Sequence, residues 1–232
     1  MSVNLSRSLI KKLSLFASLS DEELGQALLC TQPCRLGEGD VVFHQGEEAG
    51  HFYVLLCGHL KVVQVTPEGE RVLVRYVNAG DVFGIAQAMA LPAYPASAIA
   101  VQDSIVLSWP SSEWQRFAAG NASFASHAML AIGQRLQAAH RRIQELSTLP
   151  VKQRVAHALL RLVSQSGRPT ADGVSVDFPI SRQDIAEMTG TTLHTVSRLL
   201  SAWKDQGVVH LGRKRIEVRA LDALVQIANE PL

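Results

Sequence analysis

One stretch decides the fold of this chain: SRQDIAEMTGTTLHTVSRLLSAWKDQGVVHLGRKRIEVR, residues 181–219. It begins with Ser181, and Asp184 follows three residues later. This pair is typical of a helix start, because the hydroxyl and the carboxylate can satisfy free N–H groups of the first turn. Gly190 then interrupts the helical pattern, as glycine does at helix ends. The stretch therefore predicts a short helix, a tight turn and a second helix.

The second helix, capped by Thr191 or Thr192, has one apolar side and one polar side. The apolar side recurs at helical spacing and comprises Val196, Leu199, Leu200 and Trp203. The polar side comprises Thr192, His194, Thr195, Ser197, Arg198 and Ser201. Two helices joined through a glycine turn are the helix-turn-helix motif, whose second helix lies in the DNA major groove. The alternative is a surface helical hairpin with a solvated basic loop.

A basic hairpin is expected directly after these helices. Beyond Gly207 the residues VVHLGRKRIEVR alternate around Gly212, which predicts a two-stranded wing. Arg213, Lys214 and Arg215 would lie at its tip, where cations can meet phosphates.

The polar residues divide into base readers and phosphate binders. Arg198 can donate two hydrogen bonds to guanine O6 and N7, while His194 and Ser197 can donate or accept at base edges. Phosphate contacts are expected from the first helix, the turn and the wing, at Ser181, Arg182, Gln183, Thr191, Thr192, Arg213 and Lys214.

Composition and charge agree with a folded DNA-binding protein. The chain has 232 residues, of which 47% are hydrophobic and 19% charged, enough for a packed core. The formal net charge is only +1. Residues 151–232 carry 11 Lys/Arg against 8 Asp/Glu, a net +3, whereas residues 1–150 carry 11 against 13, a net −2. The positive surplus therefore accompanies the helix-turn-helix.

Several classes of protein are disfavoured. No run of about 18 apolar residues exists, so no membrane span is expected. The N-terminus is expected to form an amphipathic helix and not a signal peptide. The three cysteines, Cys30, Cys34 and Cys57, suit a reducing cytoplasm better than a disulfide framework. There is no nucleophile–base pair, Gly-rich phosphate loop or dense metal-ligand spacing, so an enzyme is not expected.

The N-terminal half changes from helical to strand-like patterns. Residues 5–30 predict two short helices, the second capped by Ser20 with Glu23. Short apolar runs follow at 41–43, 51–56, 59–65, 71–77 and 98–109. Regularly spaced glycines separate the runs, which predicts an antiparallel sandwich or barrel. Ser111 and Glu113 mark a further short helix.

A long helix over 121–147 has a strict seam of apolar residues. Its members are Ala122, Ala125, Met129, Ile132, Leu136, Ala139, Ile143 and Leu146, at alternating steps of three and four. Such a seam is typical of a helix that pairs with a second copy, with burial on its own domain as the alternative. We expect Met129, Ile132, Leu136, Ala139, Ile143 and Leu146 to make the dimer contacts.

The predicted fold class is α+β, in three parts. Residues 1–120 form an antiparallel β domain with N-terminal helices, 121–149 a dimerisation helix, and 150–232 a winged helix-turn-helix domain. Within the last part, a helix runs from Val151 to the Gly167–Pro169 stop. A strand or extended link over 174–180 and a final helix after 220 complete it.

The chain resembles the Crp/Fnr superfamily of bacterial transcription regulators over nearly its whole length. The likeness is carried by GEGDVVFHQGEEAGHFYVLLCG (37–58), Gly80-Asp81-x-Phe83-Gly84, the long helix, and SRQDIAEMTGTTLHTVSRLL (181–200). The resemblance implies a cyclic-nucleotide-binding-like β-roll that senses a small signal. It also implies a homodimer that binds two-fold symmetric double-stranded DNA and recruits or blocks RNA polymerase.

The effector pocket of the family would include Phe83, Gly84, Ile85, Ala96 and Ser97. Members that bind cyclic AMP carry Glu after the Phe-Gly pair and then an Arg-Ser pair. Ile85 and Ala96 stand in place of the Glu and the Arg, so the ribose carboxylate and the phosphate cation are missing. Because an unpaired buried phosphate is costly, control by cyclic AMP is not expected.

This chain also lacks the cofactor ligands that other known sensors of the family carry. Three cysteines cannot supply the four thiolates of an iron–sulfur cluster, and the spacing of Cys30 and Cys34 does not match. Carbon-monoxide sensors carry Cys and His just after the Phe, where this chain has Gly84 and Ala86.

The turn FGIAQAMALPAYPASA (83–98) is most similar to nitric-oxide and redox responders of denitrification, for which haem is a hypothesis. The axial ligand candidates are His44, His51 and His59, with Met89 and His127 as weaker ones. A structural role is the alternative for each histidine. A thiol switch at Cys30 and Cys34, a constitutively active regulator, and a sensor whose helix-turn-helix binds protein remain alternatives.

The recognition helix departs from relatives that read TTGAT-type half-sites. Those carry E-x-x-S-R, where this chain has His194, Ser197 and Arg198. A neutral histidine replaces poorly the glutamate that accepts from a cytosine amino group. We therefore expect a shifted preference at the base pair that His194 faces.

Overall fold

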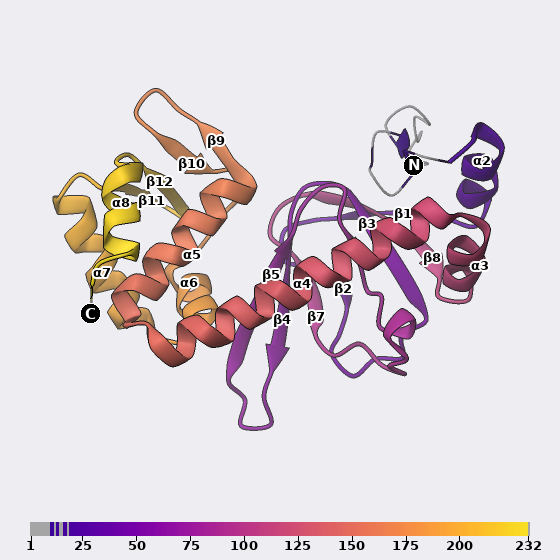
Figure 1. Cartoon of the computed structure of the whole chain (residues 1–232), viewed down its shortest axis with the longest axis horizontal. Coiled ribbons are helices and arrows are strands. Elements are labelled where there is room, and N and C mark those ends of the chain that lie inside the picture. Colours follow the sequence, from indigo (N-terminus) through magenta and orange to yellow (C-terminus); the bar gives the residue numbers. More distant parts are fainter. Residues whose placement is uncertain (1–9, 12, 14–15, 18, 232) are drawn as a thin grey trace. The chain divides into compact units, whose positions relative to one another are not determined.

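The computed structural model describes all residues except 1–9, 12, 14–15, 18 and 232. The chain divides into two compact units (Figure 1). The first contains the residues up to Val65 together with Arg75–Gln137. The second contains Thr66–Val74 together with Ala138–Leu232.

The first helix that lies wholly within the described residues of the first unit is well capped. In α2 (Asp21–Leu29) the Ser20 hydroxyl accepts a hydrogen bond from the Glu23 N–H at 3.2 Å, and the Glu23 carboxylate accepts one from the Ser20 N–H at 2.8 Å. The predicted capping is confirmed. The other predicted N-terminal helix lies mostly outside the described residues.

Two four-stranded antiparallel sheets make up most of the first unit. Their strand orders are β1-β8-β3-β6 and β2-β7-β4-β5. The bounds are β1 Gln32–Leu36, β2 Val41–Phe43, β3 His51–Cys57, β4 Leu60–Val65, β5 Arg71–Val77, β6 Val82–Phe83, β7 Ser97–Ala100 and β8 Ser104–Pro110. The predicted antiparallel architecture is confirmed. The run 98–109 forms two strands instead of one, and the sequence did not reveal β1 and β6.

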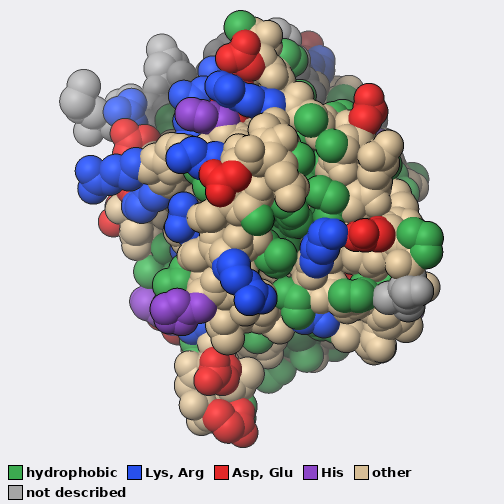
Figure 2. Space-filling view, turned by 90° about the vertical axis from the view of Figure 1, so that its left-hand side faces the viewer, with side chains coloured by type: hydrophobic (Ala, Val, Ile, Leu, Met, Phe, Trp, Pro, Cys, Tyr) green, Lys and Arg blue, Asp and Glu red, His purple; other side chains and the backbone are tan. Residues whose placement is uncertain are grey.

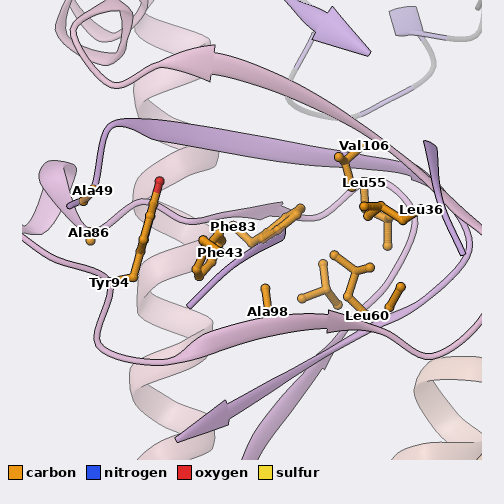
Figure 3. Packing of buried hydrophobic residues seen from close by; sticks show 12 residues of the cluster. Leu36, Phe43, Ala49, Leu55, Leu60, Phe83, Ala86, Tyr94, Ala98 and Val106 are labelled. Carbon is orange, nitrogen blue, oxygen red and sulfur yellow. The ribbon is translucent and has the colours of Figure 1, made fainter. Parts of the chain in front are cut away.

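Aromatic side chains fill the space between the sheets. Phe43 stacks on Tyr94 with ring centroids 3.9 Å apart, and Phe83 stacks on Tyr53 at 5.2 Å. Figure 3 shows Tyr94, Phe43 and Phe83 in a row, with Ala98 and Leu60 nearby. A Cβ on Gly84 would lie 2.7 Å from the Tyr53 ring. The close packing therefore requires glycine at this position.

Three helical elements complete the first unit, and one of them continues into the second. They are η1 (Gln87–Met89), α3 (Glu113–Gly120) and α4 (Ala122–Thr148). Arg135 of α4 donates a hydrogen bond to the carbonyl oxygen of Val82. Burial lowers the pKa of Arg135 to about 10; neighbouring Arg75 also lowers it, and Asp81 opposes both. This contact fixes α4 against β6, next to the expected effector positions.

The second unit is a small sheet surrounded by helices. The sheet order is β11-β12-β10-β9, with every pairing antiparallel. The elements are α5 Val151–Ser166, β9 Gly167–Pro169, β10 Val174–Val176, α6 Arg182–Thr189, α7 Leu193–Asp205, β11 Val209–Gly212, β12 Arg215–Val218 and α8 Leu221–Ala228. Gly167–Pro169, expected only to end a helix, also pairs as an edge strand with β10. This is a winged helix-turn-helix arrangement.

Candidate nucleic-acid interface

The first helix of the motif, α6, begins and ends as expected. The Ser181 hydroxyl accepts from the Asp184 N–H at 3.0 Å, and the Asp184 carboxylate accepts from the Ser181 N–H at 2.9 Å. Gly190 ends the helix in the left-handed conformation, with φ of 61°. Its amide donates to the Ala186 carbonyl. Because only glycine adopts this conformation without strain, Gly190 sets the turn into α7.

The second helix, α7, presents the expected base readers. Thr192 caps it by accepting from the Thr195 N–H at 3.2 Å. Val196, Leu200 and Trp203 are buried. The opposite side therefore faces outward, where His194 and Arg198 are exposed and Ser197 is half-buried.

The wing is tied to the start of α6. The Ile180 N–H, one residue before the α6 cap, donates to the Lys214 carbonyl at 2.9 Å. Lys214 adopts φ of 51°, the left-handed region that glycine prefers. The turn therefore holds exposed Arg213 and Lys214 beside exposed Arg182 at the start of α6.

Not every expected phosphate binder is equally available. Arg182, Gln183, Thr192, Arg213 and Lys214 are exposed, and Thr191 is half-buried. The Thr192 hydroxyl is engaged in the α7 cap, and the Gln183 amide donates to the Glu187 carboxylate at 3.2 Å. The Ser181 hydroxyl is engaged in the α6 cap, where it also donates to the Asp184 carboxylate at 2.5 Å. Arg215, expected at the tip, begins β12 and donates to the Ser175 hydroxyl at 3.1 Å. The face shown in Figure 2 has Lys and Arg side chains gathered toward its left, beside histidines.

A shallow groove lies between α6, α7 and the wing. Its volume is about 340 Å³, and Ser181, Arg182, Gln183, Leu193 and Lys214 are among its lining residues. Leu193, the first residue of α7, is 43% exposed. Sequence reasoning missed Leu193, because its spacing to Val196 and Leu200 suggests a buried position.

The expected dimer seam is largely uncovered in the single chain. Met129 is 69%, Leu136 56% and Ile143 61% exposed, and Leu146 and Ala139 are also exposed. Ile132 differs, because it packs partly against the hydrophobic cluster of the first unit. The alternative of a helix buried within its own domain therefore applies to Ile132 but not to the other expected contacts.

The five expected effector positions have different packing environments. Phe83 belongs to the cluster between the sheets, whereas Ile85 belongs to a second cluster that also contains Trp109. Gly84, which stands between Phe83 and Ile85 in the sequence, is half-buried. Ala96 is buried, and the hydroxyl of half-buried Ser97 accepts from the Gln45 N–H at 2.8 Å.

The histidines proposed as haem ligands lie outside the cluster between the sheets. His44 and His51 are exposed, and half-buried His59 pairs with Gln102 through Nδ1 at 3.1 Å. Of the weaker candidates, Met89 is 44% exposed and His127 pairs with Ser123. The stacked rings of Phe43, Tyr53, Phe83 and Tyr94 occupy the space between the sheets. The histidines proposed as ligands therefore do not fit a haem held between the sheets.

The cysteines and charged groups give no assembled metal centre. Cys34 and Cys57 are exposed and Cys30 is half-buried, all with free thiols. Within the described residues, no three His, Cys, Asp or Glu side chains gather as metal ligands. None of the helices in that same part of the chain has the length and apolar character needed to cross a membrane.

Each of the two units contains a region that matches a known protein family. The Crp-like helix-turn-helix domain matches residues 153–227, and the cyclic nucleotide-binding domain matches residues 33–121. The "Cyclic AMP receptor protein" of Thermus thermophilus is 29% identical, over 92% of this chain and 96% of that protein. The "Global nitrogen regulator" of Synechococcus elongatus is 27% identical, over 84% of this chain and 89% of that protein.

Solved structures share the fold. FixK2 from Bradyrhizobium japonicum has a TM-score of 0.76 at 24% identity, covering 87% of this chain and 99% of that chain. A mutant of CooA from Carboxydothermus hydrogenoformans has a TM-score of 0.75 at 19% identity, covering 97% of each chain. With its cyclic-nucleotide-binding-type β domain, long helix and DNA-binding helix-turn-helix, the chain belongs to the Crp/Fnr family of transcription regulators.

Proposed function

We propose that the protein acts as a homodimer, in which two α7 helices enter successive major grooves of a two-fold symmetric DNA site. The observation that carries this proposal is the surface of α7, where His194 and Arg198 are exposed on a helix that shares a groove with Lys214 of the wing. Base-edge contacts at α7 would give sequence specificity, while Arg182 and Lys214 would hold the backbone. The half-site centres would be about 34 Å apart.

The exposed seam of α4 supports the homodimer. Large apolar side chains in a strict heptad pattern lose their contact with water when a second copy of the helix covers them. Met129, Leu136 and Ile143 would supply most of this buried area, and Ala139 would allow close approach. A second copy is the natural occupant, because the two DNA half-sites require two reading helices.

We propose a gating signal other than cyclic AMP. The Thermus thermophilus relative is named for that nucleotide, but Ile85 and Ala96 are buried apolar side chains in this chain. Neither can pair with a ribose hydroxyl or a phosphate. A signal acting on the β domain could reach α4 through the contact between Arg135 and Val82. The proposed setting is the cytoplasm, with RNA polymerase as the next partner.

One set of measurements tests the proposal. Duplexes selected from a random library should converge on a palindrome, and gel shifts should give one complex containing two chains. Sedimentation should show a dimer at micromolar protein. Adding cyclic AMP should leave the affinity unchanged. A monomer at every concentration, or equal binding to all sequences, would contradict the proposal.

A further inference from the structure

We propose that Arg154 is a positioning residue that fixes the spacing between the two DNA half-sites that the dimer accepts. The inference deepens the proposed function, on which it rests, by naming the residue that sets this spacing. Arg154 lies in the first turn of α5, outside the polar face of α7, the wing and the heptad seam. It would act on DNA binding through the turn from which α7 starts.

The Arg154 side chain joins the end of α4 to the turn of the helix-turn-helix. Its Nη1 lies 3.5 Å from the carbonyl oxygen of Leu146 and 3.4 Å from that of Leu149. Its Nη2 lies 3.3 Å from the carbonyl oxygen of Gly190, the residue that ends α6. One guanidinium group therefore connects the last carbonyls of α4 with the turn into α7.

The chemistry of these acceptors favours arginine. The last carbonyls of a helix have no partner within that helix, and they carry its negative partial charge. Among the described residues, the partners of Arg154 are backbone carbonyls and not a carboxylate. The planar guanidinium presents its donors in a rigid fork, so the two sets of carbonyls are held at a fixed separation.

Leu146 and Gly190 are also in direct contact. A Cβ on Gly190 would lie only 3.0 Å from Cδ2 of Leu146, closer than ordinary van der Waals contact. Leu146 is the last residue of the heptad seam, and the seam positions Ala139 and Ile143 lie with it in the second unit. The same unit therefore contains the end of the proposed dimer seam, the Arg154 contact and the reading helix.

This connection determines which DNA sites the dimer can span. In each copy the chain of contacts runs from the seam through Arg154 to the turn and α7. Adding one base pair between the half-sites moves them apart by about 3.4 Å and turns one by about 35° relative to the other. A rigid connection resists this displacement, whereas a loose one lets each α7 follow its half-site.

Arg168 provides a matched control, because it is an arginine of the same unit with a different partner. It pairs with Asp177 at 3.0 Å, and its side chain is 72% exposed. It lies in β9, where it contacts neither α4 nor Gly190. Arg168→Gln therefore removes the same charge from the second unit while leaving the connection between α4 and the turn intact.

The experiment varies the spacer of the selected palindrome. The full-length protein is titrated with duplexes whose central spacer is one or two base pairs shorter or longer, and with a duplex that carries one half-site. Wild type should lose about tenfold or more in affinity for a change of one base pair, the discrimination that one charged hydrogen bond can supply. Arg154→Gln should bind the best spacer more weakly and the neighbouring spacers within about threefold of it.

The single half-site shows whether the reading surface itself is intact. Arg154→Gln should bind this duplex with the affinity of wild type, because the base readers of α7 are unchanged. Arg168→Gln should match wild type on every duplex. Circular dichroism checks that each variant is folded.

The outcomes separate the inference from the proposed function. The same spacer profile for Arg154→Gln and wild type would overturn the positioning role and leave sequence-specific binding by a dimer intact. An equal loss on every spacer and on the single half-site would also overturn it, because Arg154 would then only support the fold. Failure to select any palindrome would overturn the proposed function together with the inference.

A second variant decides if Arg154→Gln does not fold. Arg154→Lys keeps the positive charge, but its single nitrogen cannot reproduce the rigid fork of the guanidinium. It should therefore show the same broadened spacer profile. A profile as sharp as that of wild type would contradict the requirement for arginine and overturn the inference.

Discussion

Arg142 donates a hydrogen bond to the carbonyl oxygen of Glu187 at 2.9 Å, joining α4 to the first helix of the helix-turn-helix. Its other terminal nitrogen donates to the Leu73 carbonyl at 2.6 Å. The Glu187 carboxylate is 7% exposed and lies 3.6 Å from Nε of Arg71. Two arginines and one glutamate thus join α4, α6 and residues 66–74 within the second unit. Burial lowers the pKa of Arg142, Arg161 adds to this, and Glu145 opposes it.

Replacing Arg142 with glutamine should loosen this junction. Charged hydrogen bonds to carbonyl groups contribute about 1.5–3 kcal/mol, and glutamine cannot reach both acceptors at once. We expect the free energy of unfolding, measured with urea, to fall by roughly that amount. Hydrogen exchange of amides 66–74 should also become faster. Arg141→Gln is the control, because exposed Arg141 precedes it on the same helix; equal effects of the two variants would contradict the role of Arg142.

Replacing Arg198 or Lys214 with alanine should weaken DNA binding in two different ways. Arg198→Ala should cost about 1–3 kcal/mol of binding free energy and relax the preference at one base pair. Lys214→Ala should weaken binding to all sequences alike and reduce the salt slope by about one per lost phosphate contact. Binding of a panel of single-substitution duplexes at several salt concentrations distinguishes these results. A uniform loss for Arg198→Ala would remove it from the base readers.

Lys214 also carries backbone strain that glycine would relieve. A residue with a side chain costs roughly 1–2 kcal/mol in the left-handed region, and Lys214 has φ of 51°. Lys214→Gly should therefore raise the melting temperature while weakening DNA binding through the lost charge. Arg213→Gly is the matched change, since its φ is not positive; it should weaken binding without a gain in stability. A lower melting temperature for Lys214→Gly would show that the carbon chain of the lysine matters more than the strain.

The helix-turn-helix was predictable because its signals are local. Ser181 with Asp184, and Gly190 in the left-handed turn, each encode a hydrogen bond within a few residues. The same is true of Ser20 with Glu23. The short edge strand β6 was not predicted, because its two residues, Val82 and Phe83, are too few to show a periodic pattern.

The packing of the β domain was less predictable from the sequence, because its contacts join residues that are far apart in the chain. Phe43 and Tyr94 are 51 residues apart in sequence, yet their rings stack at 3.9 Å. No local pattern indicates that they fill the space between the sheets. Phe83 and Ile85 are only two residues apart, so both would point to the same side of an extended chain. They enter different hydrophobic clusters because Gly84 between them has φ of 67°, which breaks the extended conformation after β6. The family likeness assigns both residues to one effector pocket, and this assignment stays a prediction.

Ile143 offers the sharpest test of the homodimer. A buried isoleucine contributes about 1.5–3 kcal/mol, and a symmetric interface contains it twice. Ile143→Asp should therefore raise the dimer dissociation constant by roughly two orders of magnitude or more. Leu130→Asp is the control, since Leu130 is 59% exposed on the same helix but lies off the seam. It should leave sedimentation unchanged.

DNA binding should follow the oligomeric state. Without a partner, Ile143→Asp holds only one half-site at a time, so its affinity for the palindrome should fall to that for a single half-site. The two variants differ in the placement of one carboxylate on α4, so any general effect of added charge is shared. If Leu130→Asp dissociates and Ile143→Asp does not, the two chains pair along a different face of α4.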